Sequence, residues 1–94
     1  MISLRGKSLV AVSRDIADGY IIVNPLFLKP IDAEALKDLY RQIMKIQVEI
    51  RTEKFPFNNV AAIRARNMKL QRLQSAITII KNFAKDKGWK QFLL

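Results

Sequence analysis

The sequence predicts a mainly helical fold of the α+β class, in which an N-terminal β-hairpin precedes a long antiparallel helical hairpin. Apolar residues recur three or four positions apart through residues 32–54 and again through residues 58–87, which is the spacing of amphipathic helices. Short β-branched runs occupy the first 24 residues instead. Because 94 residues are too few for two independent cores, we expect residues 1–94 to form a single domain.

The β-hairpin is predicted within residues 1–24. Residues 8–13 (SLVAVS) and 20–23 (YIIV) are apolar, β-branched runs of strand length. Between them stands the pair Asp18-Gly19, which favours a tight turn because both residue types tolerate positive φ. An isolated two-stranded hairpin is marginal in water, so it must pack on the helices or on a second chain.

An extended apolar strap is predicted for residues 25–31. Pro25 and Pro30 remove backbone donors and favour an extended chain. Leu26, Phe27 and Leu28 lie between them and should hold the strap against the core, since exposing three such side chains is costly.

The first long helix is predicted over residues 32–54, with Asp32 as its N-cap. Its core seam consists of Leu36, Leu39, Ile43, Ile46 and Ile50. A second apolar stripe runs beside the seam and consists of Tyr40, Met44 and Val48. The two stripes together are wider than one neighbour can cover, so the helix needs at least two partners: the following helix, and either the hairpin or another subunit.

The second long helix is predicted over residues 58–87, after the break at Pro56. Asn58 or Asn59 caps its start, and Gly88 suits a left-handed C-terminal cap. Its seam consists of Ile63, Leu70, Leu73, Ile77, Ile80 and Ala84. Two helices of this length cannot enclose the broad apolar face of the first one, so we expect a homodimer whose paired hairpins form a four-helix bundle.

An apolar tail is predicted over residues 88–94. Trp89, Phe92 and Leu93 are its candidate interaction residues. The tail either docks on the core or across the dimer, or it offers a hydrophobic peptide to another protein.

The charge of the chain is concentrated in its second half. The formal net charge is +9, and residues 55–94 hold eight basic side chains against one acidic one. The first helix is balanced, with five of each sign in residues 32–54. A basic surface of this kind favours a polyanion as partner. The candidate polyanion-binding residues are Arg64, Lys69, Arg72, Lys81 and Lys85.

Arg66 is unusual because it falls on the apolar stripe, between Ile63 and Leu70. A charge there needs a partner, and aligning the helical hairpin about its loop brings Arg66 near Glu49. We therefore expect an Arg66–Glu49 ion pair; contact of Arg66 with a ligand or phosphate is the alternative.

The opposite side of the second helix is rich in amides and has no acid. It consists of Arg64, Asn67, Gln71, Gln74, Ser75, Thr78, Asn82 and Lys85. Such side chains can read base edges and contact phosphates, but a solvated face or a protein contact explains them as well.

Several classes of function are disfavoured by composition. The chain has no Cys and no His, which excludes disulfides, thiol nucleophiles and metal or haem sites built on those residues. Gly6-Lys7-Ser8 lacks the upstream Gly of a phosphate-binding loop. We therefore expect no cofactor, no metal and no enzymatic activity. The apolar runs are too short for a secretion signal or a membrane-spanning helix, so we expect a cytoplasmic protein.

Two functions from different classes follow from this pattern. The first is a non-catalytic, dimeric binding module whose basic second helix binds a polyanion, most readily nucleic acid. The alternative is an assembly module that binds an acidic protein through the amide-rich face and the apolar tail. Attachment to anionic lipid through the basic helix, Trp89 and Phe92 is a third possibility.

Overall fold

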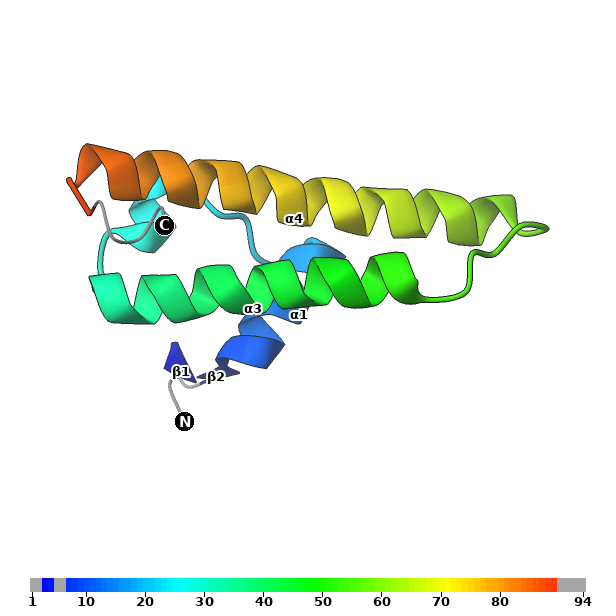
Figure 1. Cartoon of the computed structure of the whole chain (residues 1–94), viewed down its shortest axis with the longest axis horizontal. Helices are drawn as coiled ribbons and strands as arrows, with labels where there is room; N and C mark the ends of the chain where they lie inside the picture. The colour runs from blue at the N-terminus through cyan, green and yellow to red at the C-terminus, as the bar shows by residue number, and fades with distance from the viewer. Residues whose placement is uncertain (1–2, 5–6, 90–94) are drawn as a thin grey trace.

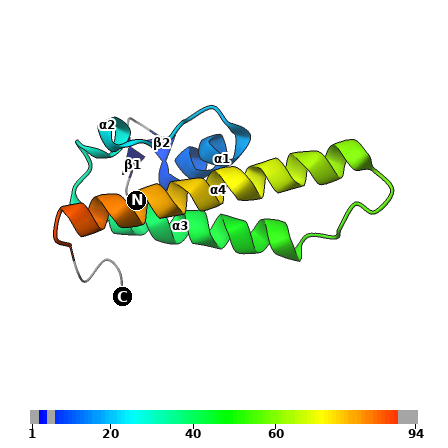
Figure 2. The same cartoon turned by 90° about the horizontal axis from the view of Figure 1, so that it is seen from above.

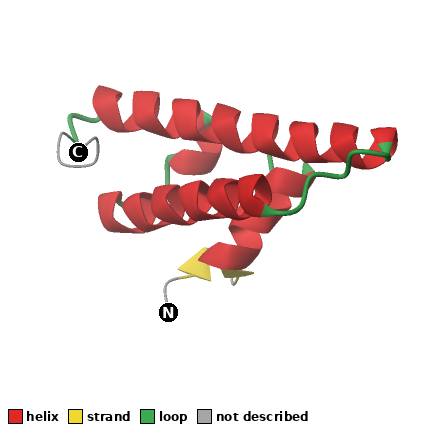
Figure 3. Cartoon of the chain, turned by 45° about the vertical axis from the view of Figure 1, so that its right-hand side comes forward, coloured by secondary structure: helices red, strands yellow, loops and turns green. Residues whose placement is uncertain are grey.

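The computed structural model describes residues 3–4 and 7–89 of the chain. Two minimal strands, β1 (Ser3–Leu4) and β2 (Lys7–Ser8), pair antiparallel with Ser3 opposite Ser8 and Leu4 opposite Lys7. The helices that follow are α1 (Leu9–Asp18), α2 (Pro25–Leu28), α3 (Ala33–Thr52) and α4 (Val60–Asp86). The molecule is therefore mainly helical, as Figure 3 shows by colour.

Helices α3 and α4 form the predicted antiparallel pair and run side by side along the length of the molecule (Figure 1). Their ends lie where the capping residues place them. The Asp32 carboxylate accepts a hydrogen bond from the Ala35 amide at 2.8 Å, and the Asn59 side chain accepts one from the Ala62 amide at 2.9 Å. Beyond α4, Gly88 adopts a φ of 76°, so the predicted left-handed cap is confirmed.

The core lies where α3, α4 and α1 meet. The predicted seam of α3 is confirmed, since all five of its residues are buried. In α4 the seam is buried from Leu73 to Ala84, whereas Ile63 and Leu70 are half-buried. The second stripe of α3 stays largely open: Met44 is 44% exposed and Val48 is 57% exposed.

The prediction of a strand over residues 8–13 is wrong, because this segment forms the start of helix α1. Ser8 is the N-cap and accepts a hydrogen bond from the Ala11 amide at 3.2 Å. Val12 and Ile16 are four positions apart, and Ala17 follows Ile16, so the three residues share one helical face. All three are buried, and α1 contacts both α3 and α4. Burial of that face overrides the β-propensity of the valines.

The turn at Asp18-Gly19 also has another role than predicted. Gly19 adopts a φ of 85° and closes the C-terminus of α1, with its amide donating to carbonyls of the last turn. Residues 20–23 form no strand, so the predicted hairpin of residues 8–23 is absent. The only pairing within the described residues is that of β1 and β2.

The predicted extended strap contains a short helix instead. Asn24 caps α2 by accepting from the Phe27 amide at 2.8 Å, and Pro25 occupies the first helical turn, where its missing N–H costs nothing. Phe27 and Leu28 are buried as expected, but Leu26 is 78% exposed. The helical turn causes this difference, because it points three consecutive side chains in different directions.

Helices α1 and α2 lie on the same side of the α3–α4 pair (Figure 2). Among the described residues, no element covers the opposite side of the pair. At the seam between the two long helices, the buried Gln47 donates a hydrogen bond to the Gln74 side chain at 3.2 Å. This bond shows which residues of α3 and α4 stand opposite one another. The predicted dimeric four-helix bundle stays a prediction.

Candidate functional site

Three acidic side chains lie on α1 or face it: Asp15, Asp18 and Glu49. All eight acids of the chain lie within the described residues. Asp15 pairs with Lys7 at 2.7 Å, and Asp18 lies 3.6 Å from Lys69. Glu49 of α3 faces the same helix, with its Oε2 atom 3.6 Å from Nη2 of Arg14. The side of α3–α4 that carries α1 is therefore a mixture of both charges.

The side away from α1 has a different character. With about 100° of rotation per residue, one stripe of α3 lies next to the buried seam and turns away from Glu49. A stripe of α4 meets it across the Gln47–Gln74 hydrogen bond. We call these two stripes the open face; it consists of Lys37, Tyr40, Met44, Val48 and Arg51 of α3, and Asn67, Leu70, Gln74, Lys81 and Lys85 of α4.

The open face combines cations with apolar groups and, among the described residues, contains no acid. Arg51, Lys81 and Lys85 are exposed, and Lys37 is half-buried. With Gln47 opposite Gln74, the antiparallel register places Lys81 opposite Tyr40. Lys37 and Lys85 lie at the same end of the face. Four positive charges thus belong to this face, and none of its ten residues is an acid, so the face attracts anions.

The five predicted polyanion-binding residues do not form one surface. Lys81 and Lys85 belong to the open face, and Arg64 is exposed on the outer side of α4. Lys69 pairs with Asp18, and Nη1 of Arg72 donates to the Ala17 carbonyl at 3.1 Å. These last two cations are directed at the C-terminus of α1, where the helix dipole is negative.

The predicted Arg66–Glu49 pair is not formed. Glu49 pairs with Arg14 instead, because the segment predicted as a strand is a helix that brings Arg14 alongside α3. The Arg66 guanidinium lies 5.1 Å from the centre of the Phe55 ring, and Nη1 donates to Asn67 at 3.3 Å. The chain that connects α3 and α4 thus supplies an aromatic face in place of a carboxylate.

The amide-rich side of α4 is exposed along its whole length, as its lack of apolar residues indicates. Three of its side chains bond within the molecule: Asn67 accepts from Arg66, Gln74 accepts from Gln47, and the Thr78 hydroxyl donates to the Gln74 carbonyl at 3.1 Å. Asn67, Gln74 and Lys85 belong to the open face as well, and the other side chains border that face on its outer edge.

Of the predicted tail residues, Trp89 packs on the protein. Its ring meets Phe83 edge-on with 6.0 Å between ring centres, and it is half-buried against the core. Its amide donates to the Ala84 carbonyl at 3.0 Å. Phe92 and Leu93 lie outside the described residues.

Lys37 and Arg51 were not among the predicted site residues, because the first helix is neutral overall. A signal was present nonetheless. Its acids lie on one side of the helical wheel, while Lys37 and Arg51 flank the second apolar stripe of Tyr40, Met44 and Val48 in the sequence. Sorting charges by helical face, instead of by segment, identifies them.

Within residues 7–89, no three acidic side chains come together in a way that suits a metal ion, and no helix is long and apolar enough to span a bilayer. The sequence matches no family model, and comparisons with curated proteins and with solved structures found no match.

Proposed function

We propose that this protein is a non-catalytic module whose open face binds the phosphate backbone of a nucleic acid. The observation that carries the proposal is the distribution of charge: Lys37, Arg51, Lys81 and Lys85 belong to the open face, whose residues include no acid, while Asp15, Asp18 and Glu49 lie on the side that carries α1. Lys and Arg side chains that neutralise phosphates supply most of the affinity of non-specific binding.

The shape of the face favours a linear polyanion. Lys85 stands near the start of α3 in the antiparallel pair, and Arg51 stands near Leu70. At 1.5 Å per residue this separation is about 22 Å along the helices. A strand of B-form duplex passes about six phosphates over that length, at 3.4 Å each. Tyr40 lies among the lysines, where an aromatic ring suits contact with a base or sugar.

An acidic protein is the second candidate, and one observation favours it. Met44 and Val48 are exposed between the cations, and such apolar groups are typical of protein interfaces. The nucleic acid remains the first choice because the cations outnumber these apolar groups and stand at both ends of the face.

The predicted homodimer would use the same open face, since α1 and α2 occupy the other side of the helical hairpin. In such a four-helix bundle, two acid-free faces with four cations each would meet. Like charges brought together in an interface oppose association, whereas a polyanion neutralises them. We therefore infer that the face serves a polyanion in preference to a second copy.

The test compares two triple variants that remove the same charge. K37Q/K81Q/K85Q removes three lysines of the open face, and K29Q/K45Q/K54Q removes three exposed lysines elsewhere. Fluorescence anisotropy with a labelled duplex measures the dissociation constant between 50 and 200 mM salt. If wild type contacts about four phosphates, its affinity falls about 150-fold over this range.

The open-face variant retains about one contact, so its affinity falls only about 4-fold with salt, while the control keeps the wild-type slope. Equal slopes for the two variants would contradict the proposal. Binding to poly-glutamate that is as tight as binding to the duplex would also contradict the proposal and would favour an acidic protein. A dimer in sedimentation experiments that Met44→Asp dissociates would contradict it as well, because the open face would then bind a second copy of the chain.

A further inference from the structure

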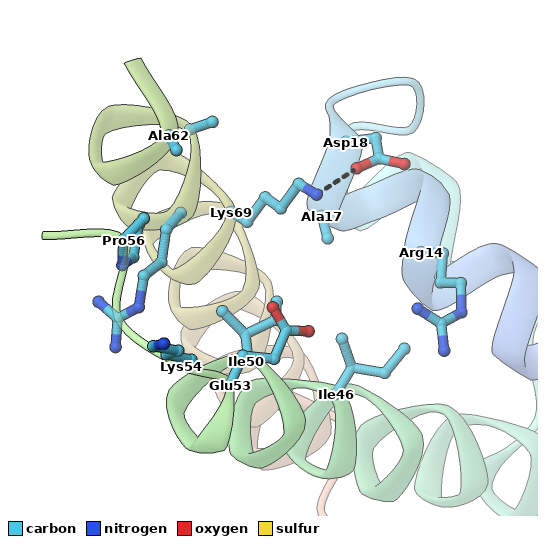
Figure 4. Close-up of a pocket in the computed structure, with 12 residues that line it drawn as sticks. Arg14, Ala17, Asp18, Ile46, Ile50, Glu53, Lys54, Pro56, Ala62 and Lys69 are labelled. Atoms are coloured by element: carbon cyan, nitrogen blue, oxygen red, sulfur yellow. Dashed lines mark ion pairs between the residues drawn. The ribbon is translucent and has the colours of Figure 1, made fainter. Parts of the chain in front are cut away.

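A second candidate site lies on the other side of the molecule, in a cleft of about 440 Å³ between α1, the C-terminal half of α3 and the N-terminal half of α4. Figure 4 shows side chains from all three helices, and Pro56 from the connection between α3 and α4, around a shared hollow. This volume falls in the range of sites for small organic molecules, about 300–1,000 Å³.

The floor of the cleft is apolar. Ile46 and Ile50 come from α3, Ala17 from α1, and Ala62 and Ala65 from α4. The two isoleucines and Ala17 are buried. The alanines of α4 leave room where longer side chains would fill the space. A ligand body in contact with this floor must itself be apolar, because the floor offers no hydrogen bond from its side chains.

The rim of the cleft is charged, with an excess of cations. Arg14, Lys54, Arg66 and Lys69 stand against Asp18 and Glu53. Lys69 and Asp18 are 3.6 Å apart, which is longer than the usual 2.7–2.9 Å of a charge-assisted hydrogen bond. Arg14 reaches Glu49 at the same distance. Since both pairs are loose, their cations can turn to an anion at the mouth of the cleft.

Arg66 offers a more specific sign of a missing acceptor. The side chain is half-buried, and its Nε atom is shielded from solvent and forms no hydrogen bond with any described residue. Its Nη1 atom is engaged by Asn67, and its plane rests on Phe55. A shielded donor without an acceptor is unfavourable, so a turn of the guanidinium toward an anionic ligand in the cleft would give this donor an acceptor.

We propose that this cleft binds an organic anion with an apolar body, whose charged head group faces Arg66 and Lys69 while its body covers Ile46 and Ile50. The cleft and the open face lie on opposite sides of the helical hairpin, so the two sites are independent. A ligand in the cleft touches α1, α3 and α4 at once and therefore stabilises the attachment of α1 to the pair.

The test is a titration of the full chain, labelled with ¹⁵N, with decanoate below its micellar concentration. Saturable shifts of amide signals from Ala17, Ile50 and Ala62 are the expected result. Decyl phosphate, with the other common head group, distinguishes a carboxylate ligand from a phosphate one, and binding of either supports the anion site. 1-Decanol lacks the charge and acetate lacks the body, so each should bind at least about 10-fold more weakly than decanoate.

Two pairs of variants separate the cleft from the surface. R66M should weaken decanoate binding about 10-fold, as expected for loss of a charged hydrogen-bond donor, whereas R64M, two residues away on the outer side of α4, leaves it unchanged. A65F places a phenyl ring in the lining of the cleft and should weaken binding, while A61F adds the same ring to a position of α4 that does not line the cleft. Circular dichroism confirms that each variant is helical.

Three results would overturn the proposal. The first is the absence of saturable shifts with both decanoate and decyl phosphate. The second is equal binding by wild type and A65F, because a ring in the lining must obstruct a ligand that lies in the cleft. The third is equal affinity for decanoate and decanol, which would make the contact merely hydrophobic. If R66M fails to fold, the A65F and A61F pair still decides the question.

Discussion

Gly19 joins two constraints at one residue. Its φ of 85° lies in the left-handed region, and a Cβ atom placed there would stand 3.0 Å from Cζ of Arg72. The guanidinium occupies this space because it hydrogen-bonds to the Ala17 carbonyl at the end of α1. The glycine therefore permits both the turn of the backbone and the close approach of the arginine.

We predict that G19A lowers the free energy of unfolding by about 1–2 kcal/mol from the backbone conformation, and further from displacement of Arg72. Gly88 provides the control, because its φ is 76° and nothing lies within 4 Å of its added Cβ. Urea denaturation of G19A and G88A measures the difference. If both variants lost the same free energy of unfolding, displacement of the Arg72 side chain by the added Cβ would carry no energetic penalty.

Arg72 itself belongs to the fold more than to a binding surface. R72M keeps the apolar stem and removes the hydrogen bond to Ala17, so it should lower the free energy of unfolding by about 0.5–1.5 kcal/mol. R64M removes the same charge from an exposed position and should leave stability within about 0.5 kcal/mol of wild type. A stability of R72M equal to that of R64M in urea denaturation contradicts a capping role for Arg72.

At the scale of elements, α1 links the two long helices. Its buried face contacts α3 and α4, and it makes ion pairs with one residue of each, Arg14 with Glu49 and Asp18 with Lys69. The charged contacts are exposed and contribute little to stability. The attachment of α1 therefore depends on the apolar side chains beneath it.

Ile16 is the most direct test of that packing. It is 2% exposed, so I16A should lower the free energy of unfolding by about 2–4 kcal/mol through lost burial and a residual cavity. Val10 belongs to the same helix and is 42% exposed, so V10A should change stability by less than about 1 kcal/mol. Thermal denaturation followed by circular dichroism measures both variants. A small effect of I16A would mean that α1 is not attached as described.

The long helices could be predicted from sequence because their signals are local. Asp32 and Asn59 cap them, and the seam residues recur with helical spacing, so the predicted boundaries of 32–54 and 58–87 differ from α3 and α4 by one or two residues at each end. Helix α1 could not be identified in this way. Its valines favour a strand locally, and only the surface offered by α3 and α4 makes the helical arrangement of Val12 and Ile16 the better one.

At the scale of the whole molecule, the charge is segregated by side. The sequence shows that the second half of the chain is basic, and from this Lys81 and Lys85 could be assigned to a cationic surface. It does not show where α1 docks. That position decides that Lys69 and Arg72 face another helix, while Lys37 and Arg51 of the neutral helix α3 share a side with the lysines of α4.

The hydrogen bond between Gln47 and Gln74 also bears on arrangements that the chain must avoid. Both long helices carry aliphatic residues at helical spacing, so a slip by one turn would again bring aliphatic side chains together. After such a slip, Leu70 or Ile77 would stand opposite Gln47, whose buried amide would lose its partner. This single polar contact thus raises the energy of pairings of α3 and α4 that are shifted by one turn, and so favours the native alignment of the two helices.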